Sequence, residues 1–233
     1  VQLCRQLTAK DRGALILIDE LQASSPEVRH LIGTYQEMVG ERLNVSLVMA
    51  GLPGAVSTTL NDRVLTFLNR ARKITLPPLE QGEVDAFFKR SFDSLGIAIA
   101  SDLRRDAAAY TAGSPYLLQL VGHYTCLYAE NGKVSEESLA EALRTSGDDF
   151  QSDVCATTLA ALSERDVNFL EAMAVLGDPA PIAAIAEAMG ATVDYAQKYR
   201  RRLIEGGVIK SAGRGKVAFD VPFLAEHLRK RNE

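Results

Sequence analysis

The amino-acid sequence predicts an α/β unit built on part of a parallel sheet, followed by an α-helical domain and by a C-terminal helical module with a hairpin. Three observations predict this order. Short apolar runs alternate with helical patterns in the first 80 residues, strand signals stop at Pro77-Pro78, and two strand-like runs return near the C-terminal end. We expect the three domains to span residues 1–79, 80–148 and 149–233.

The composition is that of a globular protein, because 47% of the 233 residues are hydrophobic and 24% are charged. No apolar run approaches the roughly 18 residues of a membrane span, so no membrane partner is expected. The three cysteines are far apart and form no CxxC pair, which predicts free thiols in a reducing cytoplasm. The chain begins at Val1 without a targeting leader, so we expect a cytoplasmic protein and a start inside a longer sequence.

Three apolar runs in the first domain, Ala14 to Ile18, Val45 to Ala50 and Lys73 to Leu76, have the length of buried strands. A helix that opens at Ser25-Pro26 and ends at Gly40 separates the first two runs. Strands joined by a crossover helix lie parallel in one sheet. The first domain is therefore expected to hold a parallel sheet that is covered by helices.

Helical patterns dominate the remainder of the chain. In the second domain we expect three or four amphipathic helices, near residues 81–95, 101–111, 114–130 and 135–145. The polar residues 145–149 indicate the approach to a further unit, although the helix could resume at Phe150. In that unit, helices are expected at residues 164–176, 181–189 and 193–205, strands at 208–211 and 216–220, and a final helix from Pro222. This order is typical of a winged helix-turn-helix domain.

Two adjacent carboxylates, Asp19 and Glu20, follow the first apolar run directly. In open parallel sheets, ligands bind beyond the carboxyl ends of the strands. A pair of acids at this position can divide the work of phosphoryl transfer, with Asp19 holding Mg²⁺ and Glu20 orienting and deprotonating a water molecule. The alternative is a buried strand that simply ends in solvated acids.

Residues 13–20 resemble the Walker B motif of P-loop ATPases, and Leu21-Gln22 extends the likeness to the DE-x-Q variant of archaeal-type and STAND ATPases. The resemblance implies that the protein uses ATP and Mg²⁺. Residues 45–53 are similar to the next strand of that family, whose tip bears the sensor-1 residue. Here the tip is Ala50-Gly51, so sensor 1 is expected to be absent or displaced to Ser57 or Thr58.

An arginine precedes the last core strand in the family, and residues 67–79 resemble that segment. The resemblance implies that Arg70, or failing it Arg72, stabilises charge on the transferred phosphoryl group, often in a neighbouring subunit. Self-association through the ATPase core is therefore expected. The alternative is that these arginines belong to a solvated cluster in front of a strand.

The segment from Ala112 to Leu120 looks like the Gly-x-Pro lid motif of STAND and archaeal ATPases. Gly113 permits a close backbone approach, and Pro115 suits the first turn of a helix whose N-terminus faces the nucleotide. The nucleotide-binding candidates are Gly113, Pro115 and Tyr116. No sensor-2 arginine follows, which favours the STAND-like branch. By itself, the segment is also an ordinary helix start.

The phosphate-binding motif G-x-x-x-x-G-K-[ST] does not occur in the sequence. In the family this loop precedes Walker B, which places it upstream of Val1. We therefore expect the chain to be a fragment that lacks Walker A and is inactive alone.

Residues 190–233 carry ten Lys and Arg residues against five Asp and Glu residues. In a winged helix, the third helix enters the major groove and the wing contacts phosphates. Candidate contacts to double-stranded DNA are Lys198, Arg201, Arg202, Arg214 and Lys216. Against DNA, Asp194 at the start of the third helix would repel phosphate, so docking of a protein remains an alternative.

The resemblance covers the whole chain and is to ATPases of the AAA+/STAND superfamily, including origin-recognition-like initiators. It implies that the parent protein binds ATP and ADP, hydrolyses ATP and couples its nucleotide state to DNA. The alternative is a nucleotide-gated switch or scaffold whose winged helix docks a protein.

Overall fold

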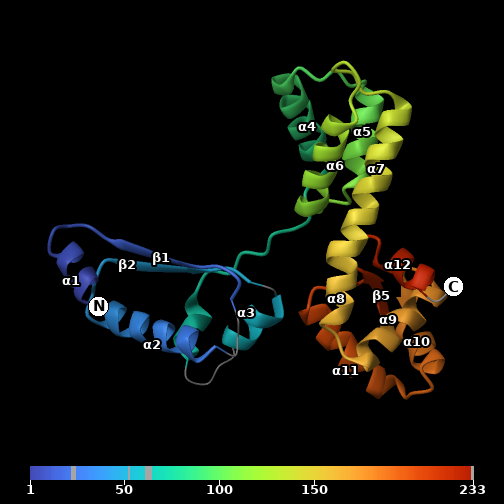
Figure 1. Ribbon diagram of the computed structural model, residues 1–233. Coiled ribbons are helices and arrows are strands. Elements are labelled where there is room, and N and C mark those ends of the chain that lie inside the picture. Colours follow the sequence, from blue (N-terminus) through green and yellow to red (C-terminus); the bar gives the residue numbers. More distant parts are fainter. Residues whose placement is uncertain (22–24, 52, 61–64, 232–233) are drawn as a thin grey trace. The chain divides into compact units, whose positions relative to one another are not determined.

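The computed structural model describes residues 1–21, 25–51, 53–60 and 65–231 (Figure 1). The chain divides into two compact units, Val1–Ile74 with Arg200–Lys210, and Thr75–Tyr199 with Ser211–Glu233. Within the described ranges, no helix combines the length and apolar character that a membrane span requires.

The first unit is built around a two-stranded parallel sheet. Its elements are α1 (Gln2–Thr8), β1 (Ala14–Ile18), α2 (Pro26–Gly40), β2 (Val45–Met49), α3 (Pro53–Leu60) and the 3₁₀ helix η1 (Thr66–Arg70). The strands pair in register from Ala14 opposite Val45 to Ile18 opposite Met49. Helix α2 starts where the sequence predicts, because the Ser25 hydroxyl accepts a hydrogen bond from the Val28 N–H at 3.2 Å.

Only one face of this sheet is covered within the described part of the chain. Leu47 and Met49 of β2 pack against a core of four buried residues, Ile32, Leu60, Leu65 and Leu68. On the other face, Leu15, Leu17 and Val48 are 62%, 69% and 52% exposed. The sequence predicts helices over both faces, since apolar residues fill both. Among the described residues, helices pack on only one of the two faces.

The third predicted strand, Lys73 to Leu76, is not formed. Ile74 and Leu76 are 72% and 87% exposed, and neither belongs to a sheet. An apolar run becomes a strand only where a neighbouring strand satisfies its backbone groups, and sequence pattern does not report on that neighbour.

The second unit begins with four helices, α4 (Gln81–Leu95), α5 (Ser101–Tyr110), α6 (Pro115–Leu127) and α7 (Glu136–Phe150). The predicted interruption at residues 145–149 is wrong. Helix α7 runs through it into the π-helical turn η2 (Gln151–Cys155) and α8 (Ala156–Ala160), so that one long rod results (Figure 1). Gly147 is buried there because the Tyr110 hydroxyl occupies the space that a Cβ would fill. Ser146 is also buried, and its hydroxyl donates to the Ala142 carbonyl at 2.7 Å.

The C-terminal part follows the predicted element order. Its elements are α9 (Glu164–Leu176), β3 (Ala180–Pro181), α10 (Ile182–Ala188), α11 (Val193–Glu205), β4 (Ile209–Ser211), β5 (Lys216–Phe219) and α12 (Leu224–Arg231). The three strands form one sheet in the order β3-β5-β4. A capping box starts α9, because the Ser163 hydroxyl accepts from the Asp166 N–H and the Asp166 carboxylate accepts from the Ser163 N–H.

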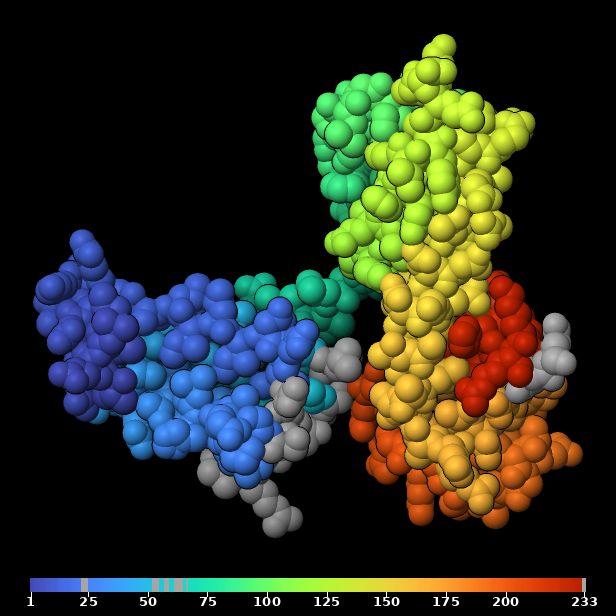
Figure 2. Space-filling model, in the orientation of Figure 1, coloured from blue at the N-terminus to red at the C-terminus, as the bar shows by residue number. Residues whose placement is uncertain are grey.

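An aromatic cluster joins the helical part of the second unit to the turn before α12. The Phe223 ring lies 5.1 Å from the ring of Tyr110 on α5 and 6.1 Å from that of Phe150 on α7. The Cys155 thiol on η2 donates to the Pro222 carbonyl at 3.5 Å. In the space-filling view, the red residues of α12 lie directly against the yellow and orange residues of the long rod and α9 (Figure 2).

Candidate active site

The two acids Asp19 and Glu20 lie at the carboxyl end of β1, as the sequence predicts, and both are exposed. Backbone pairing continues beyond the ends of the two strands. The Ala50 N–H donates to the Ile18 carbonyl, and the Leu21 N–H donates to the Ala50 carbonyl, each at 2.8 Å. The acids are therefore held on a backbone that remains tied to β2 on both sides of them.

Glu20 adopts a left-handed backbone conformation, with φ of 52°. This conformation costs a residue with a side chain roughly 1–2 kcal/mol. The Asp19 carboxylate accepts a hydrogen bond from the Glu20 N–H at 2.9 Å, which stabilises the turn. Leu21 is only 4% exposed and anchors its far end.

The tip of β2, where the sequence predicts no sensor-1 side chain, is closely packed. A Cβ on Gly51 would lie 2.8 Å from the Leu21 Cβ, so the Leu21 side chain occupies the space that a residue at the tip of β2 would need. The predicted absence of a polar side chain at this tip is therefore a consequence of packing. Gln22 and the side chains of Ser57 and Thr58, the other candidates near this tip, lie outside the described residues.

Asp19 and Glu20 provide too few ligands to enclose a metal ion by themselves, but they are enough for Mg²⁺, which also takes water and phosphate ligands. Among the described residues, no three His, Cys, Asp or Glu side chains are grouped so that they could enclose a metal ion. Magnesium usually retains several waters and takes one or two carboxylates together with substrate phosphates. An exposed pair at a strand end therefore fits Mg²⁺ that arrives with a nucleotide.

Arg70 lies in the same unit, at the last residue of η1, and its side chain is exposed. Arg72 follows it and is also exposed. Both guanidinium groups are therefore open to solvent and to a neighbouring molecule, which is the condition that a role in trans requires.

Gly113, in the second unit, lies close to the backbone of its own chain. Its carbonyl accepts a hydrogen bond from the Leu79 N–H at 2.9 Å. A Cβ at this position would lie 2.7 Å from the Pro78 Cβ and 2.8 Å from the Leu79 carbonyl oxygen. The glycine thus joins the start of α6 to the segment before α4.

The next three residues start α6. The Ser114 hydroxyl accepts from the Leu117 N–H at 3.3 Å, and Pro115 occupies the first turn. The Tyr116 hydroxyl donates to the Asp153 carboxylate on η2 at 2.7 Å. This hydrogen bond raises the pKa of Tyr116 above its ordinary value. Tyr116 is thus engaged with the π-helical turn, a contact that sequence reasoning missed because the two residues are 37 positions apart.

All five candidate DNA-binding residues are exposed. One of them, Arg202, also interacts with another group of the chain. The five residues lie on two elements, with Lys198, Arg201 and Arg202 on α11 and Arg214 and Lys216 in the β4–β5 hairpin. On the same helix, the Tyr199 hydroxyl donates to the Tyr195 hydroxyl at 2.8 Å, and the two rings lie 5.0 Å apart. Sequence reasoning missed this pair, although its i, i+4 spacing is a visible signal.

Solved structures with similar folds are P-loop ATPases. A Walker-type ATPase of Pyrococcus abyssi matches with a TM-score of 0.74 and 17% identity, over 98% of this chain and 65% of that chain. The ORC2 protein of Aeropyrum pernix matches with a TM-score of 0.52 and 15% identity, over 98% of this chain and 66% of that one. A RuvB variant of Thermotoga maritima matches with a TM-score of 0.50 and 18% identity, over 98% and 74%.

These similarities show that the chain has a P-loop ATPase-like fold. It spans slightly less than two thirds of the length of the Pyrococcus abyssi ATPase. No curated protein matches the chain. The profile of a family described as a domain of unknown function (DUF8462) matches residues 152–228.

Proposed function

We propose that this chain is the C-terminal part of an ATP-binding and ATP-hydrolysing protein of the AAA+/STAND type. The observation that carries the proposal is the position of Asp19 and Glu20. They are exposed carboxylates at the carboxyl end of a parallel strand in a P-loop ATPase-like fold, on a turn anchored by Leu21.

Asp19 is the residue that would hold Mg²⁺, with the nucleotide phosphates as further ligands. When bound, the ion supplies positive charge that neutralises the phosphate oxygens. Glu20 orients the attacking water and accepts its proton, because its carboxylate is free of the hydrogen bond that occupies Asp19.

The remainder of the ATPase core is expected to cover the exposed face of the sheet. Leu15, Leu17 and Val48 form an apolar face that parallel sheets normally bury. The phosphate-binding loop, which this sequence does not contain, belongs to that remainder in our proposal. Arg70 would act in trans on a nucleotide of a second copy, and Gly113, Pro115 and Tyr116 would form the lid over the nucleotide.

A single substitution tests the chemistry. In the full-length protein, Glu20→Gln should reduce ATP turnover by about 10²–10⁴-fold while ATP binding persists, because the amide cannot accept a proton. The matched control is Glu37→Gln on α2, an exposed carboxylate away from the strand end. Turnover by Glu20→Gln at the unmodified rate, or no turnover by the unmodified protein, would refute the assignment.

We further propose that the C-terminal module is a winged helix that contacts double-stranded DNA. Support comes from the element order, the three-stranded sheet β3-β5-β4 and the exposed basic residues of α11 and the hairpin. Charge reversal at Arg201, Arg202 and Arg214 should abolish binding of duplex DNA at low salt. A triple reversal at exposed Lys10, Arg90 and Lys133 controls for net charge and should retain most of the binding.

Docking of a protein is the second candidate for this module. It is favoured by the first turn of α11, where Val193 and Tyr195 are 46% and 36% exposed beside the acid Asp194. Exposed apolar side chains next to a carboxylate fit a protein surface better than they fit phosphate. Failure of the unmodified chain to bind duplex DNA at low salt would select this candidate.

A further inference from the structure

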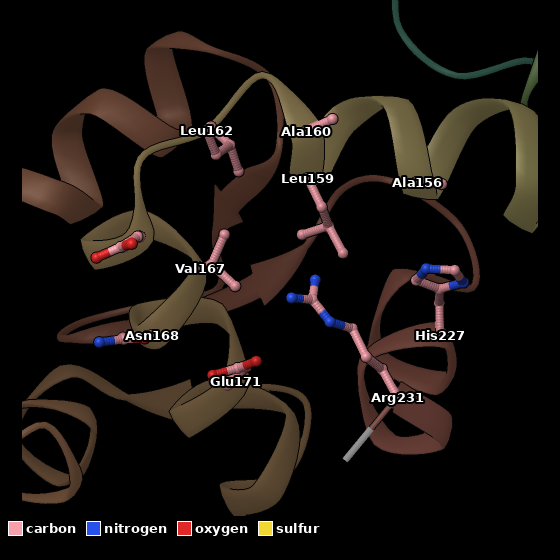
Figure 3. A pocket seen from close by; sticks show the side chains of 10 residues that line it. Ala156, Leu159, Ala160, Leu162, Val167, Asn168, Glu171, His227 and Arg231 are labelled. Carbon is pink, nitrogen blue, oxygen red and sulfur yellow. The ribbon is translucent and has the colours of Figure 1, made fainter.

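A cavity of about 460 Å³ lies between α8, α9 and α12 in the second unit (Figure 3). Its volume falls in the range of roughly 300–1,000 Å³ that is common for small-molecule sites. None of the proposed ATPase or DNA-binding residues lines it. Nine of its ten lining residues fall inside the family match at residues 152–228.

The cavity has an apolar side formed by three side chains. Leu159 of α8 is 5% exposed, while Leu162 and Val167 are half-buried around it. Figure 3 shows Leu159 and Val167 pointing into the cavity from two different helices. An apolar group of a ligand that binds here would be transferred from water onto an apolar surface that is already formed.

Opposite charges face each other across this apolar side. The Arg231 side chain extends from α12 into the cavity toward Val167, and Glu171 stands on the α9 wall (Figure 3). Although α9 and α12 pack against each other, no ion pair joins Arg231 to Glu171 among the described residues. Figure 3 shows the two side chains on different walls of the cavity.

His227 completes the α12 wall one helical turn before Arg231. Burial lowers its pKa, and the nearby charges of Arg231 and Lys230 lower it further. Arg231 carries the positive charge on this wall, and Glu171 and Glu164 carry the negative charge on the α9 wall.

We propose that this cavity binds a small zwitterion with an apolar body, namely an apolar α-amino acid or a short peptide with free termini. The ligand carboxylate pairs with Arg231, its ammonium group pairs with Glu171, and its apolar side chain lies on Leu159 and Val167. A ligand with both charges complements both walls, whereas a ligand with one charge would leave the opposite wall unpaired. The site is independent of the ATPase chemistry proposed above.

The test is calorimetric titration of the chain with L-leucine and, separately, with the dipeptide Leu-Leu. Saturable binding of either ligand is expected, and the tighter one identifies the source as a free amino acid or a peptide. N-acetyl-leucine, which lacks the ammonium group, and leucinamide, which lacks the carboxylate, should each bind at least about tenfold more weakly.

Two variants locate the binding. Arg231→Gln and Glu171→Gln should each weaken the binding of the tighter zwitterion at least about tenfold. Lys230→Gln and Glu187→Gln remove the same charges at exposed neighbouring positions outside the cavity and should leave the affinity within about twofold. Circular dichroism confirms that each variant is folded. Absence of saturable binding, equal binding of the singly charged analogues, or equal losses in the control variants would overturn the proposal.

Discussion

Replacement of Gly113 by alanine would add a methyl group where a proline ring and a backbone carbonyl leave no room for it. The glycine has φ of 74°, and the added Cβ would lie 2.7 Å from the Pro78 Cβ and 2.8 Å from the Leu79 carbonyl oxygen. A proline ring and a backbone carbonyl cannot rotate away. The hydrogen bond from Leu79 to Gly113 therefore has to lengthen, or the segment before α4 has to move.

The size of the effect follows from two contributions. A left-handed conformation costs alanine about 1–2 kcal/mol, and overpacking adds about 1–3 kcal/mol, so Gly113→Ala should lower the free energy of unfolding by about 2–5 kcal/mol. Gly96→Ala is the matched control. Gly96 has φ of 69° with nothing within 4 Å of its Cβ position, so only the first contribution of about 1–2 kcal/mol applies there.

Urea unfolding followed by far-UV circular dichroism measures both variants against the unmodified chain. Gly113→Ala should lose more free energy than Gly96→Ala by the overpacking contribution, about 1–3 kcal/mol. Equal losses in the two variants would show that the backbone before α4 yields without cost. The explanation of Gly113 by close approach would then be wrong.

Two other groups give predictions of different kinds. Asp85→Asn should cost about 1 kcal/mol at neutral pH, because half-buried Asp85 accepts hydrogen bonds from Arg104 at 2.8 and 3.2 Å. Arg104 lowers the pKa of Asp85, so this stability exists above the ordinary pKa of the carboxyl group and is lost as the pH falls through the lowered value. Urea midpoints of both proteins should converge as the pH falls through the lowered pKa of Asp85, and a constant gap would contradict the assignment. Burial raises the pKa of Cys155 to about 11, so a thiol reagent should label it in urea and not in the folded chain, as peptide mass spectrometry would show. Equal labelling in both states would refute its burial.

Helix boundaries were the most predictable part of the fold, because they depend on residues close in sequence. Helices α4 and α9 begin and end at the predicted residues. The serines that precede α2, α6 and α9 each accept a hydrogen bond from a backbone N–H three residues later. Such caps are local chemistry that a sequence displays directly.

Contacts between distant residues were not predictable in this way. The polar residues 145–149 have the composition of a loop, yet they are helical because Gly147 packs against Tyr110 and Ser146 bonds to its own helix. The run from Lys73 to Leu76 has the pattern of a strand, yet no strand forms. In both segments the secondary structure depends on the residues that pack against the segment or pair with it. The local amino-acid composition does not show which residues those are.

The candidate active site shows both kinds of information. The position of Asp19 and Glu20 was determined by sequence alone, because the end of an apolar run places the following acids at the end of a strand. The geometry of the site was decided by tertiary structure. Leu21 packs against Gly51, 30 residues away, and this contact both anchors the turn of Glu20 and leaves the tip of β2 without a side chain. The proposed zwitterion cavity likewise depends on tertiary structure, because Arg231 and Glu171, which both line it, are 60 residues apart in sequence.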